Sequence, residues 1–123
     1  SYWFTHCMMK NQTNLIVLRL LRDLQHQQTP LSFLSLWSLI LLVYKCQPHP
    51  IESITQLFRL VFACLSSGLL LTGALGPGLI DPCEKDLVDA TEYLSTDERL
   101  SITHYAQTVL RLIAFEQYEQ LFQ

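Results

Sequence analysis

Paired acidic side chains are the first feature of this chain that could support chemistry. Asp86 and Asp89 stand three residues apart and would share one face of a helix, where carboxylates can hold a magnesium ion. The sequence contains no Asp-x-Asp pair of the kind that a nucleotidyl or phosphoryl transferase uses to bind its metal. Acids at this spacing are common on solvated helix surfaces, so we expect no metal site, no catalytic residue and no cofactor.

Thiol and imidazole side chains are the second candidate group. Cys46 and His49 could join Cys64 and Cys83 as zinc ligands, but their spacing matches no compact zinc finger. Cys64 falls inside an apolar helical pattern, where cysteine usually packs as a small hydrophobe. Cys83 with His104 is the best candidate for a nucleophile pair, yet acidic neighbours disfavour a thiolate at Cys83. No secretory signal is visible, so we interpret the thiols as reduced and intracellular.

Helical periodicity predicts the elements that would carry these groups in the first part of the chain. The predicted helices lie at residues 13–28, 34–46 and 51–67. The first should fray from Gln25 onward and stop at Thr29 and Pro30, and Gly68 should cap the end of the third. The expected core stripe of the second is Trp37, Ile40, Leu41 and Tyr44. That of the third is Ile54, Leu57, Phe58, Val61, Phe62 and Leu65.

A glycine- and proline-rich segment at residues 76–86 divides the chain. Its Gly-Pro-Gly opening interrupts the helical pattern, so we expect this segment to cross the surface between helical regions. The Asp81 carboxylate can cap the turn that begins with Pro82, Cys83 and Glu84. This structural role for the four residues requires no active site.

The C-terminal part predicts one long helix with two apolar edges. Ser95 and Glu98 match a capping box, and the helix should run from there to about residue 122. Its inner stripe comprises Ile102, Tyr105, Ala106, Val109, Leu112 and Ile113. Its second apolar edge comprises Leu110, Phe115, Tyr118 and Phe122. One helix cannot turn both edges into one small core, so we expect one edge to face a partner. Together with a short stretch at 87–94, the predicted helices indicate an all-α, compact lobe of about five helices.

The composition indicates that this chain buries part of its surface against another structure. Half of its 123 residues are hydrophobic and 15% are charged, which suggests contact with more of a longer chain, a partner or lipid. Residues 1–80 hold five basic groups against two acids, whereas residues 81–123 hold nine acids against three basic groups. Neither part has a basic run that could follow a phosphate backbone, so we expect no direct nucleic-acid binding.

Two uncharged stretches raise the alternative of a membrane segment. Residues 31–44 are uncharged over 14 positions, too few to span a bilayer, which takes about 20 apolar residues. Residues 60–80 are uncharged over 21 positions but contain Ser66-Ser67-Gly68 and the Gly-Pro-Gly sequence. Neither stretch has flanking basic clusters, so no membrane contact is expected, although a membrane-associated helical hairpin remains an alternative.

The residues in this order resemble the DZF domain. This domain occurs in zinc-finger RNA-binding proteins, interleukin enhancer-binding factors and the spermatid perinuclear RNA-binding protein. Residues 81–86, Asp-Pro-Cys-Glu-Lys-Asp, resemble its signature. The other matching features are Trp3-Phe4, Leu20 to Leu24, Trp37 with Leu41-Leu42, Arg59 to Gly68, Ala106-Gln107, Leu110-Arg111 and Ala114-Phe115. The resemblance covers nearly the whole chain, and residues 25–30 depart from the family pattern.

The resemblance implies a fold and a role. Residues 1–123 would be the helical C-terminal lobe of a DZF domain, similar to that of nucleotidyltransferases of the 2′-5′-oligoadenylate synthetase type. The N-terminal nucleotidyltransferase-like lobe is expected to be absent from this chain. The domain would be catalytically inactive and would pair with another DZF domain in an RNA-binding regulatory protein of the nucleus or cytoplasm. RNA would be bound by other domains of that protein.

Six residues are candidates for contact with that partner. They are Leu69, Leu70, Leu71, Phe115, Tyr118 and Phe122. The leading alternative function is the substrate-side lobe of an active template-independent nucleotidyltransferase, completed by an upstream domain.

Overall fold

The computed structural model describes residues 11–47, 53–71 and 90–122. Within these ranges the chain forms α-helices and short 3₁₀ helices, with no strand. In chain order they are α2 (Gln12–His26), η1 (Pro30–Phe33), α3 (Leu36–Lys45), α4 (Ile54–Ser66), α5 (Thr96–Ala114) and η2 (Tyr118–Gln120). The predicted all-α lobe is therefore confirmed, with four α-helices in the described part instead of about five.

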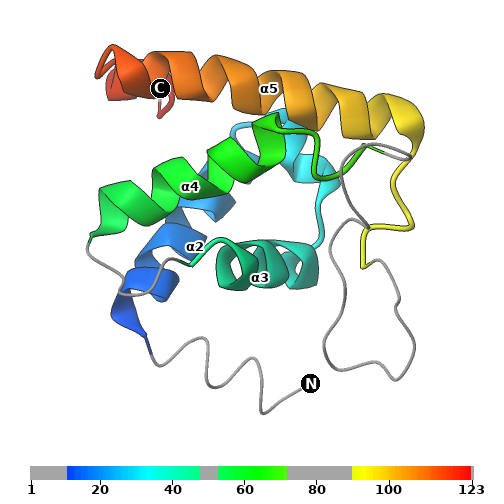
Figure 1. The fold of residues 1–123 in the computed structure, drawn as a ribbon, viewed down its shortest axis with the longest axis horizontal. Helices are drawn as coiled ribbons and strands as arrows, with labels where there is room; N and C mark the ends of the chain where they lie inside the picture. Colours follow the sequence, from blue (N-terminus) through cyan, green and yellow to red (C-terminus); the bar gives the residue numbers. More distant parts are fainter. Residues whose placement is uncertain (1–10, 48–52, 72–89, 123) are drawn as a thin grey trace.

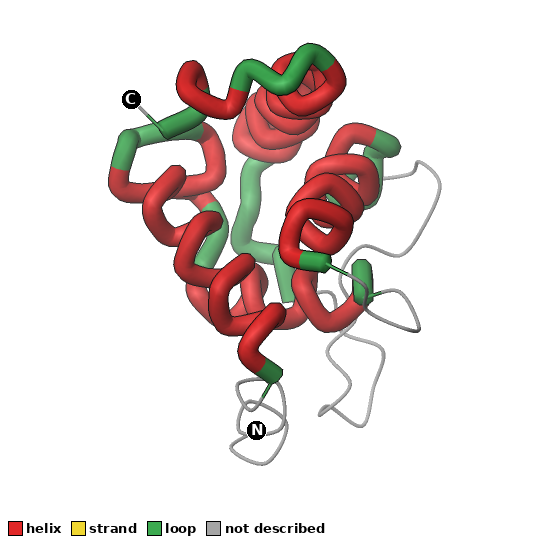
Figure 2. The backbone as a smooth tube through the Cα atoms, turned by 90° about the vertical axis from the view of Figure 1, so that its left-hand side faces the viewer, coloured by secondary structure: helices red, strands yellow, loops and turns green. Residues whose placement is uncertain are grey.

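The helices stack in an order that differs from their order in the chain. Figure 1 shows α5 along one edge of the molecule, with α4 beneath it and α2 and α3 on the far side of α4. The most extensive contact between elements joins α4 to α5, and α2 packs on both α3 and α4. Figure 2, turned by 90°, shows only helices and loops in the described segments. Because α4 lies at the centre, it must be apolar along a wide face.

The core stripe predicted for the third helix is confirmed for most of its length. Leu57, Val61, Phe62 and Leu65 of α4 are fully buried, and Phe58 is 4% exposed. Phe62 is the largest fully buried side chain, and its ring meets that of Tyr105 from α5 edge-on, with centroids 6.2 Å apart. Two residues predicted to be in the core lie near the surface instead. Ile54, from the stripe of the third helix, is 37% exposed, and Tyr44, from the stripe of the second helix, is 49% exposed. Both stand near helix ends, where fewer neighbours are available to cover a side chain.

Side-chain caps fix where the helices begin. The Ser95 hydroxyl accepts a hydrogen bond from the Glu98 amide at 3.1 Å, and the Ser95 amide donates to the Glu98 carboxylate at 2.8 Å. This is the capping box predicted from the sequence. Asn11, Ser35 and Ser53 cap α2, α3 and α4 in the same way, by accepting from amides of the first turn.

The end of α2 differs from the expectation. Gln25 was predicted to fray, but it is 9% exposed, and its amide nitrogen donates to the carbonyls of Leu31 at 2.9 Å and Leu34 at 2.8 Å. These bonds tie α2 to η1, a 3₁₀ helix that the sequence analysis did not predict. The chain turns at Gln28, which has φ 61°. A side chain that satisfies two backbone carbonyls holds the helix end in place.

The end of α5 is the largest correction. The helix stops at Ala114 rather than near residue 122, because Glu116 takes the left-handed conformation at φ 56°. The Glu116 amide then donates to the Ile113 carbonyl at 3.0 Å, and the Gln117 amide donates to the Leu112 carbonyl at 2.8 Å. This pair of bonds is a Schellman motif, which ends a helix and reverses the chain. The predicted second apolar edge is therefore not one helical edge.

Buried Arg99 joins two segments that are distant in the chain. Its guanidinium donates to the Leu70 carbonyl at 2.7 Å and to the carbonyls of Thr91 and Leu94, and the residue is 7% exposed. It therefore fixes the chain just after α4 against the turn that precedes α5.

Several sequence-based expectations fall on parts of the chain outside this description. These are the helical tail at 1–9, the crossing segment at 76–86, most of the stretch at 87–94, and the proposed cap of Asp81 with Pro82, Cys83 and Glu84. Among the helices of the described residues, none has the length and apolarity that crossing a lipid bilayer requires.

Candidate functional site

The C-terminal end of α5 presents the most exposed large apolar side chain of the described residues. Phe115, the residue that caps α5, is 74% exposed. Its amide donates to the Arg111 carbonyl at 3.2 Å, so the backbone that carries the ring is held by the end of the helix. Tyr118 follows at the start of η2 and is 37% exposed. The Schellman turn thus places two aromatic side chains at the surface within four residues.

The residues after Tyr118 return to the core. Leu121 is 5% exposed, and Phe122 packs partly buried against the core. The Phe122 ring lies 6.2 Å from that of Phe58 on α4, measured between centroids. Three of the predicted partner-facing residues therefore divide into two roles. Phe115 and Tyr118 lie at the surface, whereas Phe122 attaches the end of the chain to α4.

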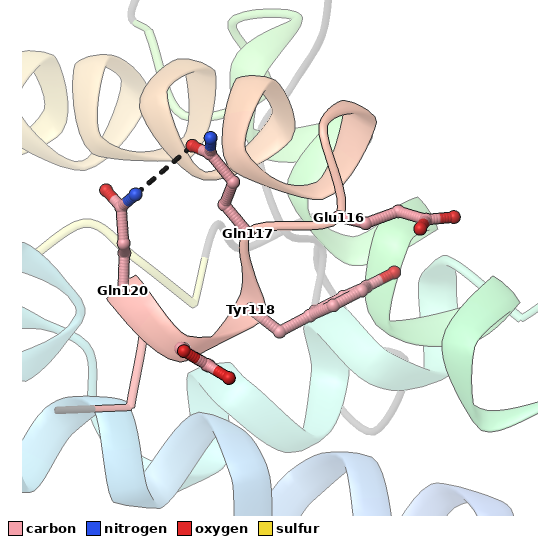
Figure 3. Close-up of a pocket in the computed structure, with 5 residues that line it drawn as sticks. Glu116, Gln117, Tyr118 and Gln120 are labelled. Carbon is pink, nitrogen blue, oxygen red and sulfur yellow. Dashed lines mark hydrogen bonds between the residues drawn. The ribbon is translucent and has the colours of Figure 1, made fainter.

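A hollow of about 460 Å³ lies on this C-terminal turn. It is lined by the consecutive residues Glu116, Gln117, Tyr118, Glu119 and Gln120. Figure 3 shows the side chains of Glu116 and Tyr118 extending to one side of the turn and those of Gln117 and Gln120 to the other. The Gln120 amide nitrogen donates to the Gln117 side-chain oxygen at 3.2 Å. Because a single short segment lines the hollow, it is the concave side of a turn rather than a cleft between elements, where ligand pockets usually form.

The other predicted partner-facing residues follow α4. Gly68 takes φ 94° and its amide donates to the Leu65 carbonyl at 3.2 Å, which confirms it as the residue that ends the helix. Leu69 and Leu71 are partly exposed, but Leu70 is 1% exposed. The expectation for Leu70 needs correction, because a side chain enclosed by its own core presents no surface to a partner.

Two of the four residues that the sequence analysis grouped as candidate zinc ligands, Cys46 and Cys64, affect each other in the folded chain. Cys46, at the end of α3, and Cys64, near the end of α4, are joined by a thiol hydrogen bond. This bond, burial and the neighbouring Cys64 thiol together raise the pKa of Cys46. The same bond lowers the pKa of Cys64 to about 7, with help from the Lys45 ammonium and against the effect of burial. Spacing alone gave no signal for this pair, because the contact depends on how α3 and α4 pack.

The metal and nucleophile candidates are not assembled in the described residues. Within those residues, no group of three or more His, Cys, Asp or Glu side chains could hold a metal ion. His49, Cys83, Asp86 and Asp89 lie outside the description, and His104 is exposed on α5. The candidate zinc set and the Cys83–His104 pair therefore stay untested.

The model of the DZF C-terminal domain matches residues 13–123 of this chain. The chain belongs to the DZF family. The match begins one residue inside α2 and spans every later helix of the described structure. It confirms the resemblance drawn from residues 81–86 and from the helices around them. Membership implies a nucleotidyltransferase-like DZF fold, to which this chain contributes the helical C-terminal domain.

Within the DZF C-terminal domain, the surface formed by Phe115 and Tyr118 is the strongest candidate site. We call it the α5-end surface. Both residues are aromatic, both are exposed, and both are held by a backbone with defined hydrogen bonds. Aromatic anchors on fixed backbone are typical of protein-binding surfaces rather than of catalytic sites.

Proposed function

We propose that this chain is a protein–protein dimerisation lobe of an RNA-binding regulatory protein, that it is not an enzyme, and that its partner is another DZF domain. The observation that carries the proposal is the 74% exposure of Phe115 at the end of α5 in a DZF C-terminal domain. Phe115 and Tyr118 lie within four residues of each other beside the acidic side chains of Glu116 and Glu119, and an exposed apolar patch with a polar rim is typical of a protein–protein contact.

The energetics favour an anchoring role for this ring. Covering a phenylalanine side chain gains roughly 1.5–3 kcal/mol, and aromatic residues dominate the energy of many interfaces. Phe115 loses little further freedom on binding, because its backbone already bonds to Arg111 and Ile113. A stable interface buries roughly 800 Å² on each partner, so Phe115 and Tyr118 would be anchors within a larger contact.

Charge around the anchors indicates what the partner offers. Glu116 and Glu119 flank Tyr118 on the exposed turn, and both are exposed to solvent. An acidic rim steers a basic protein surface toward the aromatic anchors and repels a nucleic-acid backbone. RNA binding is therefore assigned to other domains of the full-length protein, which we place in the nucleus or cytoplasm.

Light scattering on the full chain, alone and mixed with the C-terminal domain of another DZF protein, tests this proposal. We expect a stable mixed dimer that the double variant F115D/Y118D does not form. The matched control is Leu100→Asp, on the same helix at 41% exposed, because an added acid near a helix N-terminus is tolerated. This control should pair normally, and circular dichroism should show equal helicity in all three proteins.

Two results would overturn the proposal. If F115D/Y118D forms the mixed dimer normally, the α5-end surface is not part of the interface. If the chain stays monomeric with every DZF domain tested, the result would instead favour the nucleotidyltransferase-lobe alternative. The sequence of an upstream domain would then test that alternative.

A further inference from the structure

The chain reverses after α5 at a residue that is poorly suited to the reversal. Glu116 has φ 56°, in the left-handed region that glycine adopts freely and other residues adopt at a steric cost. Figure 3 shows the backbone from Glu116 to Gln120 turning back from the end of the helix. Because a strained backbone persists only where surrounding contacts hold it, the reversal depends on contacts that the following residues make.

Those contacts come from two apolar side chains at the end of the described chain. Leu121 is 5% exposed, and Phe122 is partly buried with its ring 6.2 Å from that of Phe58 on α4, measured between centroids. We call residues 117–122 the C-terminal segment, and the part of α4 around Phe58 that Phe122 covers the Phe58 site. The segment therefore fills a site that another element of the same chain provides.

The local sequence favours a different path for the segment. Residues 115–122 contain no glycine or proline, and Glu, Gln and Leu, which are good helix formers, fill five of the eight positions. This composition is the reason that the sequence predicts α5 to continue to about residue 122. A helix continued from Ala114 to Phe122 would be about 12 Å longer, at about 1.5 Å per residue, and would take Phe122 away from its own Phe58 site.

We propose that two copies of this chain exchange their C-terminal segments. In the exchanged dimer α5 continues through Glu116 as one helix, and Leu121 and Phe122 of each copy cover the Phe58 site of the other. Each copy regains the apolar contacts that its own segment gives up, and neither keeps the strained residue. The dimer is isologous, because each copy gives and receives the same residues.

A continued α5 also gathers the aromatic side chains of this region. Phe115, Tyr118 and Phe122 stand at i, i+3 and i+7, so in one helix they share an edge. The edge that carries Phe122 to the second copy therefore also carries the two side chains that are exposed in the closed monomer, at 74% and 37%. The exchange goes beyond the proposed function, because its partner is a second copy of this chain rather than a different DZF protein.

Substitutions at Glu116 should shift the balance in opposite directions. Glu116→Ala should favour the dimer, because alanine is the best helix former and still carries the steric cost of a positive φ. Glu116→Gly should favour the monomer, because glycine accepts a positive φ and weakens a continuous helix. The association constants of the two variants should differ by at least about tenfold, since the change acts in both copies. Light scattering over a concentration series, after warming to allow exchange, measures both constants.

An isotope-mixing experiment identifies which residues are exchanged. Phe122 is replaced by the photo-reactive residue p-benzoylphenylalanine in the Glu116→Ala chain, and natural-abundance and heavy-nitrogen preparations are mixed. In the dimer, illumination should link the residue-122 peptide of one isotope to the α4 peptide of the other. In the monomer, the two linked peptides should always carry the same isotope.

The matched control is Glu116→Ala combined with Phe122→Ala, which removes the exchanged ring and should return the protein to the monomer. Circular dichroism should show that this variant keeps its helices. Equal association by Glu116→Ala and Glu116→Gly, or a Glu116→Ala chain that stays monomeric at every concentration, would overturn the proposal. So would a dimer that persists without Phe122, or dimer crosslinks within one isotope only. Pairing with a different DZF protein is measured separately, so the failure of one proposal leaves the other standing.

Discussion

The ring of Phe122 packs against the ring of Phe58, with centroids 6.2 Å apart and planes inclined at 34°. Phe58 in turn meets Phe62 edge-on at 5.1 Å, and Phe62 meets Tyr105 of α5. These contacts connect the end of the chain to the centre of the core through aromatic rings. The reversal at Glu116 is what brings Phe122 back to α4, and it leaves Phe115 outside.

Replacing Phe122 by alanine should destabilise the protein. The ring is partly buried on α4, so its loss should cost about 1–2 kcal/mol, less than for a fully buried phenylalanine. The control Phe115→Ala removes a ring that is 74% exposed and should change stability by less than about 0.5 kcal/mol. Urea unfolding followed by circular dichroism compares the two. Equal losses would mean that Phe122 does not hold the end of the chain to α4.

Replacing Arg99 by methionine should lower the free energy of unfolding by about 3 kcal/mol, because buried carbonyls at Leu70 and Leu94 lose a charged donor. Arg99→Lys should recover only part of this, since one ammonium cannot reproduce the planar fork of a guanidinium. Arg111→Met, on the exposed side of α5, is the control and should be nearly neutral. Urea midpoints for the three variants measure the order. If Arg99→Lys kept the full free energy of unfolding, the planar shape of the guanidinium would not be needed to hold these carbonyls.

Replacing Glu116 by glycine should stabilise the protein by roughly 0.5–1 kcal/mol, because glycine adopts a positive φ without the steric cost that other residues carry. Gln28→Gly, at the corresponding turn after α2 with φ 61°, should act in the same direction. Thermal unfolding of both variants provides the measurement. A lower melting temperature for Glu116→Gly would indicate that the Glu116 side chain has a stabilising contact that outweighs its backbone strain.

Alkylation of Cys64 should depend on pH with a midpoint near 7 rather than near the ordinary thiol pKa of 9.0. The thiolate is the reactive form and its fraction rises with pH, so a lowered pKa moves the curve toward acid. Removing the hydrogen bond with Cys46→Ala should shift the midpoint upward, and Lys45→Gln should shift it upward by less. Iodoacetamide rates at the Cys64 peptide measure these curves. An unchanged midpoint in Cys46→Ala would show that Cys46 does not lower the pKa of Cys64.

The helical elements and most of their starts could be predicted from the sequence, since these depend on near neighbours. The stripe in α4 and the capping box of Ser95 and Glu98 are contacts within a few residues, so spacing alone reveals them. The ends of α2 and α5 could not be predicted in the same way. At both, a residue other than glycine takes a positive φ, which has no clear mark in the sequence.

The candidate surface was predicted in part. Phe115 and Tyr118 stood out as apolar residues beyond the inner stripe of one helix, and both are exposed. Leu70 and Phe122 stood out equally in the sequence, but the structure uses them in the core or against α4. An excess of apolar residues indicates that some must face a partner, yet packing decides which ones are left at the surface.

The sequence by itself determined the all-α class, the DZF family and the excess of apolar side chains, because each depends on residue order and composition. Only the tertiary structure decided the division between Phe115 and Phe122, the three carbonyls that Arg99 holds, and the pairing of Cys46 with Cys64. These relationships join residues that are distant in the chain. Their distances depend on how helices pack and where the chain reverses, which local propensities do not specify.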